Sequence, residues 1–197
     1  MGHNKNILIG ILSLQGAIKE HILALQSLNI SSRIIKNIKD LDGLNGLIIP
    51  GGESTAIKDL LKKADLLNKL QKLIHNGFPI FGTCAGMVLL AQKDGLNSLD
   101  AKVIRNGFGR QQQSFEENLN FRGFKKPFPG IFIRAPYLIN TAPDIEILSR
   151  VNNKIVAVKK SNILATAFHP ELTSDNRIHD YFIQHFVKKS TLTKSKN

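Results

Sequence analysis

The chain has 197 residues, of which 42% are hydrophobic and 21% charged, ordinary values for a globular protein with one well-buried core. The formal net charge of +12 is the one unusual value, but the lysines fall on a C-terminal tail and along helix faces without alternating with aromatic residues. A generally basic surface, suited to an acidic partner, is therefore favoured over specific nucleic-acid binding.

The single cysteine excludes an internal disulfide framework and fits a reducing compartment. Lys5 and the apolar run over residues 7–14 faintly resemble a signal peptide, but no small-residue cleavage site follows them. No apolar stretch approaches the length needed to span a membrane. We therefore expect a cytoplasmic protein with no membrane partner.

The first half of the chain alternates short apolar runs with amphipathic segments, the pattern of an α/β fold. We expect an open, mostly parallel twisted sheet with helices on both faces. Helices are expected from Ile18 onward and over residues 55–75, the latter with Ser54 or Thr55 as its N-cap. Ligands bind such sheets at the carboxyl ends of the strands. The strands are expected at residues 7–14, 33–38, 47–50 and 78–81.

The second half contains short strand-like runs separated by Pro, Gly and Asn, which we interpret as hairpins and edge strands added antiparallel to the same sheet. A closing helix is expected over residues 177–188, with Ile178, Tyr181, Phe182, His185 and Phe186 facing inward. We expect one domain over residues 1–189 and a disordered basic tail over residues 190–197. The strand-like runs are at residues 114–121, 130–135, 145–148, 155–158 and 164–168.

Cys84 lies in the segment Phe-Gly-Thr-Cys-Ala-Gly at 81–86, between an apolar approach and a helix-like run at 87–91. A strand, a glycine-flanked turn and a helix form a nucleophile elbow, which holds the nucleophile in a strained backbone conformation. The positive end of the helix favours the thiolate, and the amide of Ala85 would face a developing oxyanion. The alternative interpretation is a small buried cysteine without a chemical role.

The tripeptide His169-Pro170-Glu171 follows the apolar run over residues 164–168. In an extended chain, side chains two positions apart project to the same side, so Glu171 would orient the imidazole of His169. The other ring nitrogen would take a proton from Cys84 and later return it to a leaving amine. Alone the tripeptide reads as a turn with a capping glutamate, but together with Cys84 it predicts a Cys-His-Glu triad.

The remaining histidines show no spacing that builds a metal site, so we expect no metal and no cofactor. They are His3, His21, His75, His179 and His185.

The segment Pro50-Gly51-Gly52-Glu53-Ser54 joins a predicted strand to a predicted helix. Two consecutive glycines allow backbone amides to approach a ligand, and Gly52 would supply the second oxyanion donor. A phosphate-binding loop is the rival interpretation, but the Lys-Ser/Thr of a Walker motif is missing.

Three segments together resemble those of class I, triad-type glutamine amidotransferases: Pro-Gly-Gly-Glu-Ser-Thr at 50–55, Gly-Thr-Cys-Ala-Gly at 82–86 and His-Pro-Glu at 169–171. Within that superfamily the chain is similar to the glutaminase subunits of pyridoxal 5'-phosphate synthase, over residues 7–188. The further segments that carry this similarity are Leu14-Gln15-Gly16, Arg105-Asn106, Phe108-Gly109-Arg110-Gln111, Ser114-Phe115 and Ile133-Arg134-Ala135-Pro136.

The resemblance implies hydrolysis of L-glutamine to L-glutamate and ammonia through a γ-glutamyl thioester on Cys84. It also implies a partner, the synthase subunit that builds pyridoxal 5'-phosphate, in a large hetero-oligomer that receives the ammonia. Gln15 would help to couple docking to formation of the oxyanion hole. The residues that would hold the substrate are Gly52, Glu53, Ser54, Arg105, Ile133 and Arg134.

The sequence departs from this pattern at Gly107, where serine is common, at Ile104, where glutamate often precedes the arginine, and in a short connection over residues 93–101. Three rival functions stay open at this point. The first is another triad amidohydrolase, such as a γ-glutamyl hydrolase or a cysteine peptidase. The others are a non-catalytic scaffold with a vestigial site and a basic nucleic-acid binder.

Overall fold

The computed structural model describes residues 7–13, 16–109 and 114–194. The first half alternates strands and helices in chain order, as expected. The strands are β1 (Leu8–Leu12), β2 (Ser31–Ile35), β3 (Gly46–Ile49) and β4 (Ile80–Thr83), and the helices are α1 (Ile18–Ser27), a short 3₁₀ helix η1 (Ile38–Leu41), α2 (Ser54–Lys63), α3 (Leu66–His75) and α4 (Ala85–Ala91).

The second half is mainly β-structure, closed by a helical segment. Its strands are β5 (Lys102–Ile104), β6 (Ser114–Leu119), β7 (Phe128–Ile133), β8 (Tyr137–Ile139), β9 (Glu146–Val151), β10 (Lys154–Lys160) and β11 (Ile163–Thr166). Its helices are the 3₁₀ helix η2 (Pro170–Leu172), α5 (Arg177–Phe182), a π-helical turn η3 (Ile183–Val187) and α6 (Lys188–Lys194).

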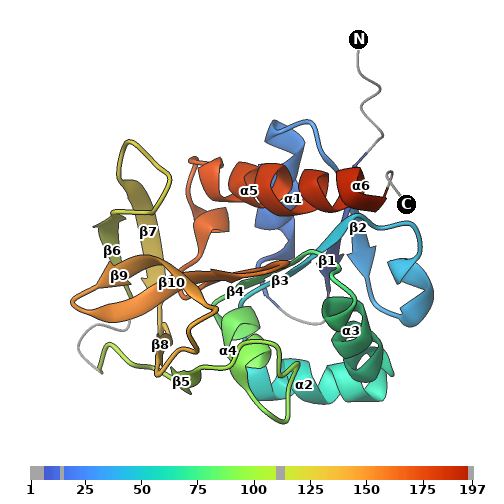
Figure 1. The fold of residues 1–197 in the computed structure, drawn as a ribbon, viewed down its shortest axis with the longest axis horizontal. Coiled ribbons are helices and arrows are strands. Elements are labelled where there is room, and N and C mark those ends of the chain that lie inside the picture. Colours follow the sequence, from blue (N-terminus) through green and yellow to red (C-terminus); the bar gives the residue numbers. More distant parts are fainter. Residues whose placement is uncertain (1–6, 14–15, 110–113, 195–197) are drawn as a thin grey trace.

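The main sheet has the strand order β2-β1-β3-β4-β11-β10-β8-β5, and β9 pairs with β10. The five strands from β2 to β11 are mutually parallel, whereas β10, β8, β5 and β9 add antiparallel pairs. Helices α1, α5 and α6 cover one face, and α2, α3 and α4 cover the other (Figure 1). The predicted α/β architecture, an open and mostly parallel sheet with helices on both faces, is confirmed.

Strand β4 lies between β3 and β11 in the parallel part and brings distant segments together. Gly82 is in register with Ile49 on β3 and with Ala165 on β11. The carboxyl ends of these three strands therefore meet, and the loops that follow them carry Gly51, Cys84 and His169. All four residues of β3, β4 and β11 are buried, as expected for continuous apolar runs in a sheet covered on both faces.

Strands β6 and β7 do not join the main sheet, which corrects the expectation that all later strands extend it. They form a separate antiparallel two-stranded ribbon, with Ser114 opposite Ile133 and Leu119 opposite Phe128. In Figure 1 the ribbon stands at the end of the molecule away from α3. Its inner side carries Phe128 and Phe132, whose rings lie 5.8 Å and 5.6 Å from the ring of Phe168, so aromatic packing joins it to the chain that follows β11.

The expected helix over residues 55–75 is two helices. Asp65 adopts a left-handed conformation with φ 55° and separates α2 from α3. The N-cap of α2 is Glu53, not Ser54 or Thr55, because its carboxylate accepts hydrogen bonds from the backbone amides of Thr55 and Ala56 at 3.0 Å and 2.7 Å.

The closing helix also differs from the expectation in detail. His185 is exposed, so placing it on the inward face was wrong, whereas His179 is fully buried. The π-helical turn η3 inserts one extra residue per turn and shifts the inward face at this point. Helix α6 continues through Lys194, so it includes residues 190–194 of the tail that we expected to be disordered.

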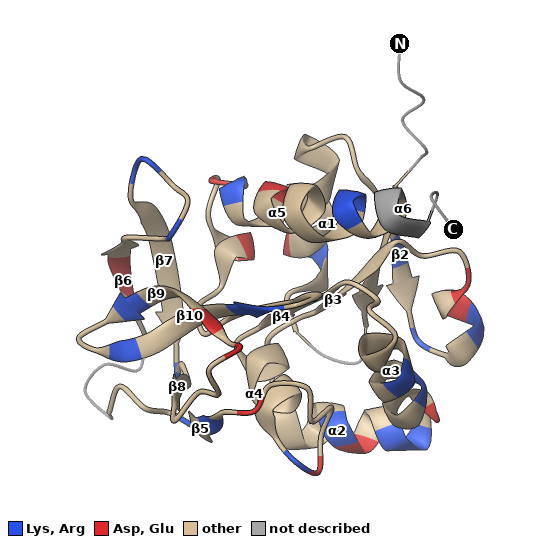
Figure 2. Ribbon diagram, in the orientation of Figure 1, with Lys and Arg blue, Asp and Glu red and all other residues tan. Residues whose placement is uncertain are grey.

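Lysines and arginines are distributed over helices on both sides of the sheet and over the antiparallel strands, interspersed with acidic residues (Figure 2). Within the described ranges, no helix combines the length and the apolar character required to cross a bilayer.

Candidate active site

Cys84 lies between β4 and α4, with φ 49° and ψ −102°. Its backbone amide donates to the carbonyl of Thr166 on the neighbouring strand at 2.7 Å, which fixes the turn. A Cβ on Gly86 would overlap the carbonyl oxygen of Ile49, so only glycine allows α4 to start so close to β3. These features are the strained, glycine-flanked elbow that the sequence predicts, and they leave Cys84 8% exposed.

His169 and Glu171 approach Cys84 from the end of β11. The Nδ1 atom of His169 lies 2.8 Å from Oε1 of Glu171, and its imidazole is close enough to Cys84 for the thiol to raise its pKa. The expected contacts are therefore present, but the local reason we gave for them was wrong. Residues 170–172 form the 3₁₀ helix η2, not an extended strand, and this tight turn folds the carboxylate back onto the imidazole.

A pocket of about 340 Å³ opens over Cys84 and His169. Glu171 lies behind His169 and does not line the pocket, in keeping with an orienting role. All the other residues predicted for catalysis, the oxyanion hole or substrate binding line this pocket: Gly52, Glu53, Ser54, Cys84, Ala85, Arg105, Ile133, Arg134 and His169.

Two ends of the pocket wall are joined by an ion pair. Arg105, just after β5, has Nη2 at 2.9 Å from Oε1 of Glu53, which also caps α2. The amides of Thr55 and Ala56 hold the pKa of the Glu53 carboxyl below its ordinary value, and the hydrogen bond from Arg105 adds to this effect. Ser54, the first residue of α2, is buried and also lines the pocket.

The ribbon supplies another wall of the pocket through the end of β7. The carbonyl of Ile133 lies 3.9 Å from the sulfur of Cys84 and accepts its weak hydrogen bond, and the amide of His169 donates to the carbonyl of Ile131 at 2.8 Å. Arg134 follows with φ 43°, an uncommon conformation for a large side chain, and is exposed. The ribbon is thus fixed to both reactive residues.

Gly51 lies directly against the reactive pair. A Cβ at this position would come 2.5 Å from Cε1 of His169 and 3.3 Å from Cβ of Cys84. The glycine loop therefore lies on the pocket side of both residues, and Gly52 and Ala85 line the pocket beside them. Their amides are the candidate oxyanion donors.

The surroundings of His169 favour its charged form. Burial lowers the pKa of His169, but hydrogen bonds to Cys84 and to Glu171 outweigh burial and raise it to about 10. Burial would raise the pKa of Glu171, but His21 and the hydrogen bond from His169 hold it below its ordinary value. An imidazolium next to a thiol, with an ionised carboxylate behind it, is suited to nucleophilic attack on a carbonyl carbon.

Sequence reasoning missed two buried histidines behind this triad. His21 on α1 and His179 on α5 are both 0% exposed, and Nδ1 of His21 lies 2.9 Å from Nε2 of His179. The signal available in the sequence was positional, since His21 lies three residues after Ile18 and four before Leu25 and so falls on the apolar face of α1.

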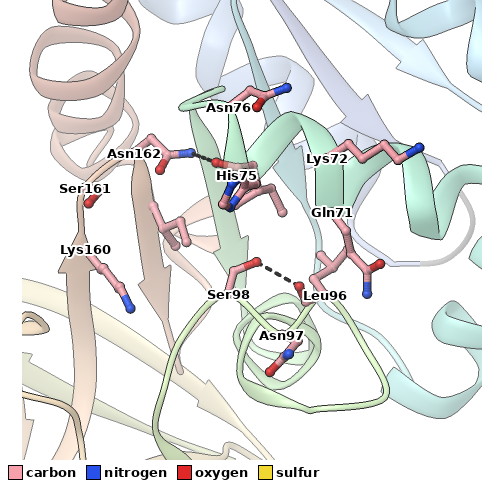
Figure 3. A pocket seen from close by; sticks show the side chains of 12 residues that line it. Gln71, Lys72, His75, Asn76, Leu96, Asn97, Ser98, Lys160, Ser161 and Asn162 are labelled. Atoms are coloured by element: carbon pink, nitrogen blue, oxygen red, sulfur yellow. Dashed lines mark hydrogen bonds between the residues drawn. The ribbon is translucent and has the colours of Figure 1, made fainter.

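A second, larger pocket of about 670 Å³ lies at the opposite edge of the sheet, where β4 and β11 begin (Figure 3). Its wall includes Lys72, His75 and Lys160, and the amide of Asn162 donates to the carbonyl of Ile74 at 3.1 Å. Lys160 is paired with Asp144 at 3.1 Å. The chain's single cysteine lies at the other end of β4, so this pocket lacks the predicted nucleophile.

The comparisons with known proteins agree with the geometry. The model of the SNO glutamine amidotransferase family matches residues 11–188. The chain belongs to this family. It is 48% identical over 185 residues to the pyridoxal 5'-phosphate synthase subunit PdxT of Listeria monocytogenes serotype 4b, covering 91% of this chain and 98% of that protein. It is 43% identical over 192 residues to the protein of the same name from Bacillus cereus, covering 94% and 97%.

Solved structures agree with this assignment. A crystal structure of a glutamine amidotransferase superposes with a TM-score of 0.85 at 41% identity, covering 89% of this chain and 97% of that one. A glutamine amidotransferase from Thermotoga maritima has a TM-score of 0.64 at 15% identity, covering 98% of this chain and 86% of that one, which shows a shared fold alone.

One departure from the family pattern has a local explanation. A Cβ on Gly107 would overlap the ring of Tyr137, so a serine does not fit beside this tyrosine. Lys154 completes the arrangement, with Nζ donating to the carbonyl of Gly107 at 2.7 Å and lying 5.0 Å from the Tyr137 ring centroid. Nothing in the structure explains Ile104. Of the other segments typical of the family, Leu14, Gln15, Arg110 and Gln111 lie outside the described residues.

Proposed function

We propose that this protein is the glutaminase subunit of a pyridoxal 5'-phosphate synthase, which hydrolyses L-glutamine to L-glutamate and ammonia for vitamin B6 biosynthesis. The observation that carries the proposal is the proximity of Cys84, His169 and Glu171, the first two of which line a pocket that also contains Glu53 and Arg105. Membership of the SNO family and the identity to PdxT subunits support the choice of glutamine as substrate.

In the proposed mechanism, the Cys84 thiolate attacks the side-chain amide carbon of glutamine. The amides of Gly52 and Ala85 stabilise the oxyanion that forms. The His169 imidazolium donates its proton to the departing nitrogen, so ammonia leaves and a γ-glutamyl thioester remains. Neutral His169 then takes a proton from water, whose oxygen attacks the thioester, and the proton returns as glutamate and the thiol are released. Glu171 keeps the imidazole oriented through both halves of the reaction.

The pocket offers complementary charges to a free amino acid. The α-carboxylate of glutamine suits the guanidinium groups of Arg105 and Arg134, and the α-ammonium suits the carboxylate of Glu53 and the carbonyl of Ile133. Ser54 at the base of α2 adds a hydroxyl. The Arg105–Glu53 ion pair places a positive and a negative group side by side, where they would bind the α-carboxylate and the α-ammonium of glutamine.

The product explains why we also propose a partner. Ammonia released into water near neutral pH becomes ammonium and loses its nucleophilic lone pair. The relatives are named as subunits of pyridoxal 5'-phosphate synthase, which supports a partner that carries out the synthetic step, and we infer this partner to be the synthase subunit in a hetero-oligomer. A reducing compartment preserves the reactive thiol, which favours action in the cytoplasm.

A glutaminase assay with and without the synthase subunit tests the proposal. We expect glutamate release that rises when the synthase subunit is added, and a fall of about three orders of magnitude or more in Cys84→Ala. Arg122→Ala is the matched control, because Arg122 is a largely exposed side chain remote from the pocket lining.

Two outcomes would reject the proposal. Turnover in Cys84→Ala equal to that of the wild type would exclude Cys84 as the nucleophile. Turnover of polyglutamyl or peptide substrates in preference to glutamine would instead identify a γ-glutamyl hydrolase or a cysteine peptidase.

A further inference from the structure

The buried pair His21–His179 extends the polar chain behind Glu171. The two histidines come from α1 and α5, far apart in the sequence and on the same face of the sheet (Figure 1). Neither lines the pocket over Cys84. Burying two imidazoles costs free energy unless their nitrogens form hydrogen bonds. Because both histidines are 0% exposed, a buried polar partner is needed to offset this cost.

That partner is the outer oxygen of the triad carboxylate. Oε1 of Glu171 accepts the hydrogen bond from Nδ1 of His169, while Oε2 faces Nε2 of His21 at 3.6 Å. Oε2 and Nε2 are fully buried and have no hydrogen-bond partner elsewhere among the described residues. The separation is longer than a formed hydrogen bond, and catalytic contacts of this kind often tighten only with substrate bound.

The chemistry of these atoms fixes both tautomers. An ionised carboxylate only accepts, so Nε2 of His21 carries the hydrogen that faces Glu171. Burial lowers the pKa of His21, and burial lowers the pKa of His179 to about 3, so both rings are neutral at pH 7. Nδ1 of His21 is therefore the acceptor, and Nε2 of His179 donates to it across 2.9 Å.

The resulting arrangement points hydrogens toward Glu171 from both sides. His179 donates to His21, His21 points its second N–H at one carboxylate oxygen, and His169 donates to the other. The charged and titratable groups that act on His21 are Glu171 and His169 from the end of β11, His179 from α5 and Glu20 on α1 itself. The rings of His21 and Phe81 on β4 also pack in a T-shaped arrangement, with the centroids 6.4 Å apart.

We propose that His21, supported by His179, is a positioning residue of the triad: it holds the Glu171 carboxylate in the orientation that steers His169 toward Cys84. His21 acts through Glu171 and touches neither the substrate pocket nor the sulfur. The inference rests on the proposed glutaminase function, and one of its two readouts does not need glutamine turnover.

The first readout is steady-state kinetics in the presence of the synthase subunit. We expect His21→Leu to lower kcat by about 10–100-fold, with KM for glutamine changed less than about threefold, since His21 does not line the pocket. His21→Gln should recover most of kcat, because its amide N–H reaches toward the position of Nε2. His21→Asn, which reaches only the position of Nδ1, should not. Leu25→Val is the control, since it loosens the same buried face of α1 and leaves the polar chain intact.

The second readout is alkylation of Cys84 by iodoacetamide as a function of pH. Cys84 is the chain's single cysteine, so the label reports one site. In His21→Leu and His21→Asn the imidazolium is held less firmly, and we expect the alkylation rate near pH 7 to fall. In His21→Gln and Leu25→Val the profile should match that of the wild type.

The outcomes separate the two proposals. A wild type that alkylates normally but hydrolyses no glutamine with the synthase subunit overturns the proposed function, while the alkylation series still tests His21. Wild-type kcat and alkylation in His21→Asn overturn the positioning role, as do equal losses in His21→Asn, His21→Gln and Leu25→Val. The Asn and Gln variants keep the test decisive if His21→Leu does not fold.

Discussion

Nη2 of Arg105 lies 2.9 Å from Oε1 of Glu53, and this ion pair joins the residue after β5 to the residue that caps α2. Both side chains are about half exposed, so the pair contributes little to the free energy of unfolding. Its importance is the placement of a guanidinium and a carboxylate side by side in the pocket wall.

Replacing Arg105 or Glu53 should therefore have different effects on substrate binding and on stability. We expect Arg105→Gln to raise KM for glutamine about tenfold with little change in the melting temperature. Glu53→Gln should also raise KM and should lower the melting temperature by about 2–4 °C, because the N-cap of α2 is weakened. Kinetics and thermal unfolding of both variants measure these effects. An unchanged KM in both variants would show that the ion pair does not contribute to substrate binding.

Gly51→Ala should disturb the reactive pair without disturbing the core. The new Cβ would lie 2.5 Å from Cε1 of His169, so the imidazole must rotate away from the sulfur. We expect kcat to fall by about 10–100-fold. Iodoacetamide labelling near neutral pH should slow in parallel, because the thiolate loses its imidazolium partner. A variant with wild-type kcat would show that the ring has room to move.

The pH dependence of the free energy of unfolding should reflect the titration of His169. Its folded-state pKa of about 10 lies above the ordinary value of 6.5, so its proton stabilises the folded chain fully below about pH 6.5. This contribution is lost as the pH rises toward about 10. We expect the free energy of unfolding to fall across this interval in the wild type and to fall less in His169→Gln. Denaturant titrations at several pH values measure the difference, and parallel curves would contradict it.

The same group should titrate differently once the thiol is removed. The hydrogen bond to Cys84 is the largest influence that raises the pKa of His169, so this pKa should decrease in Cys84→Ala. NMR titration of the imidazole, assigned with His169→Gln, follows it directly. An unchanged value would attribute the shift to Glu171 alone.

Gly107 and Tyr137 should behave as a coupled pair. Gly107→Ser places a side chain into the ring of Tyr137 and should destabilise the fold by about 1–3 kcal/mol. In a Tyr137→Ala background the same exchange should cost less, since the obstructing ring is gone. A double-mutant cycle measured by denaturant unfolding gives the coupling, and additive effects would contradict it.

Much of the fold was predictable because the central strands are continuous apolar runs and the amphipathic segments between them have helical spacing. The break between α2 and α3 was not, since apolar spacing continues across Asp65 and does not reveal the left-handed conformation of this residue. The separate ribbon β6–β7 also escaped prediction, because strand pairing partners are not encoded in the alternation of a single strand.

The predicted site residues meet for a reason that the sequence does contain. Cys84, Gly52 and His169 each follow a buried strand, and the carboxyl ends of parallel strands share one edge of a sheet. The contribution of His21 was hidden, because a histidine on an amphipathic helix carries no sign of the carboxylate that it will face. The turn that joins His169 to Glu171 was likewise predictable as a contact but not as a 3₁₀ helix.

The ribbon β6–β7 is a sheet of its own, so the pocket is built from two separate sheets. The proposed reactive residues Cys84 and His169 follow strands of the parallel core, whereas Ile133 and Arg134, which we propose to hold the substrate, lie at the end of the two-stranded ribbon. An exposed residue at the end of this ribbon, such as Arg134, can be exchanged at a lower energetic cost than a residue of the core. Substrate preference can therefore drift in evolution while the reactive centre stays unchanged.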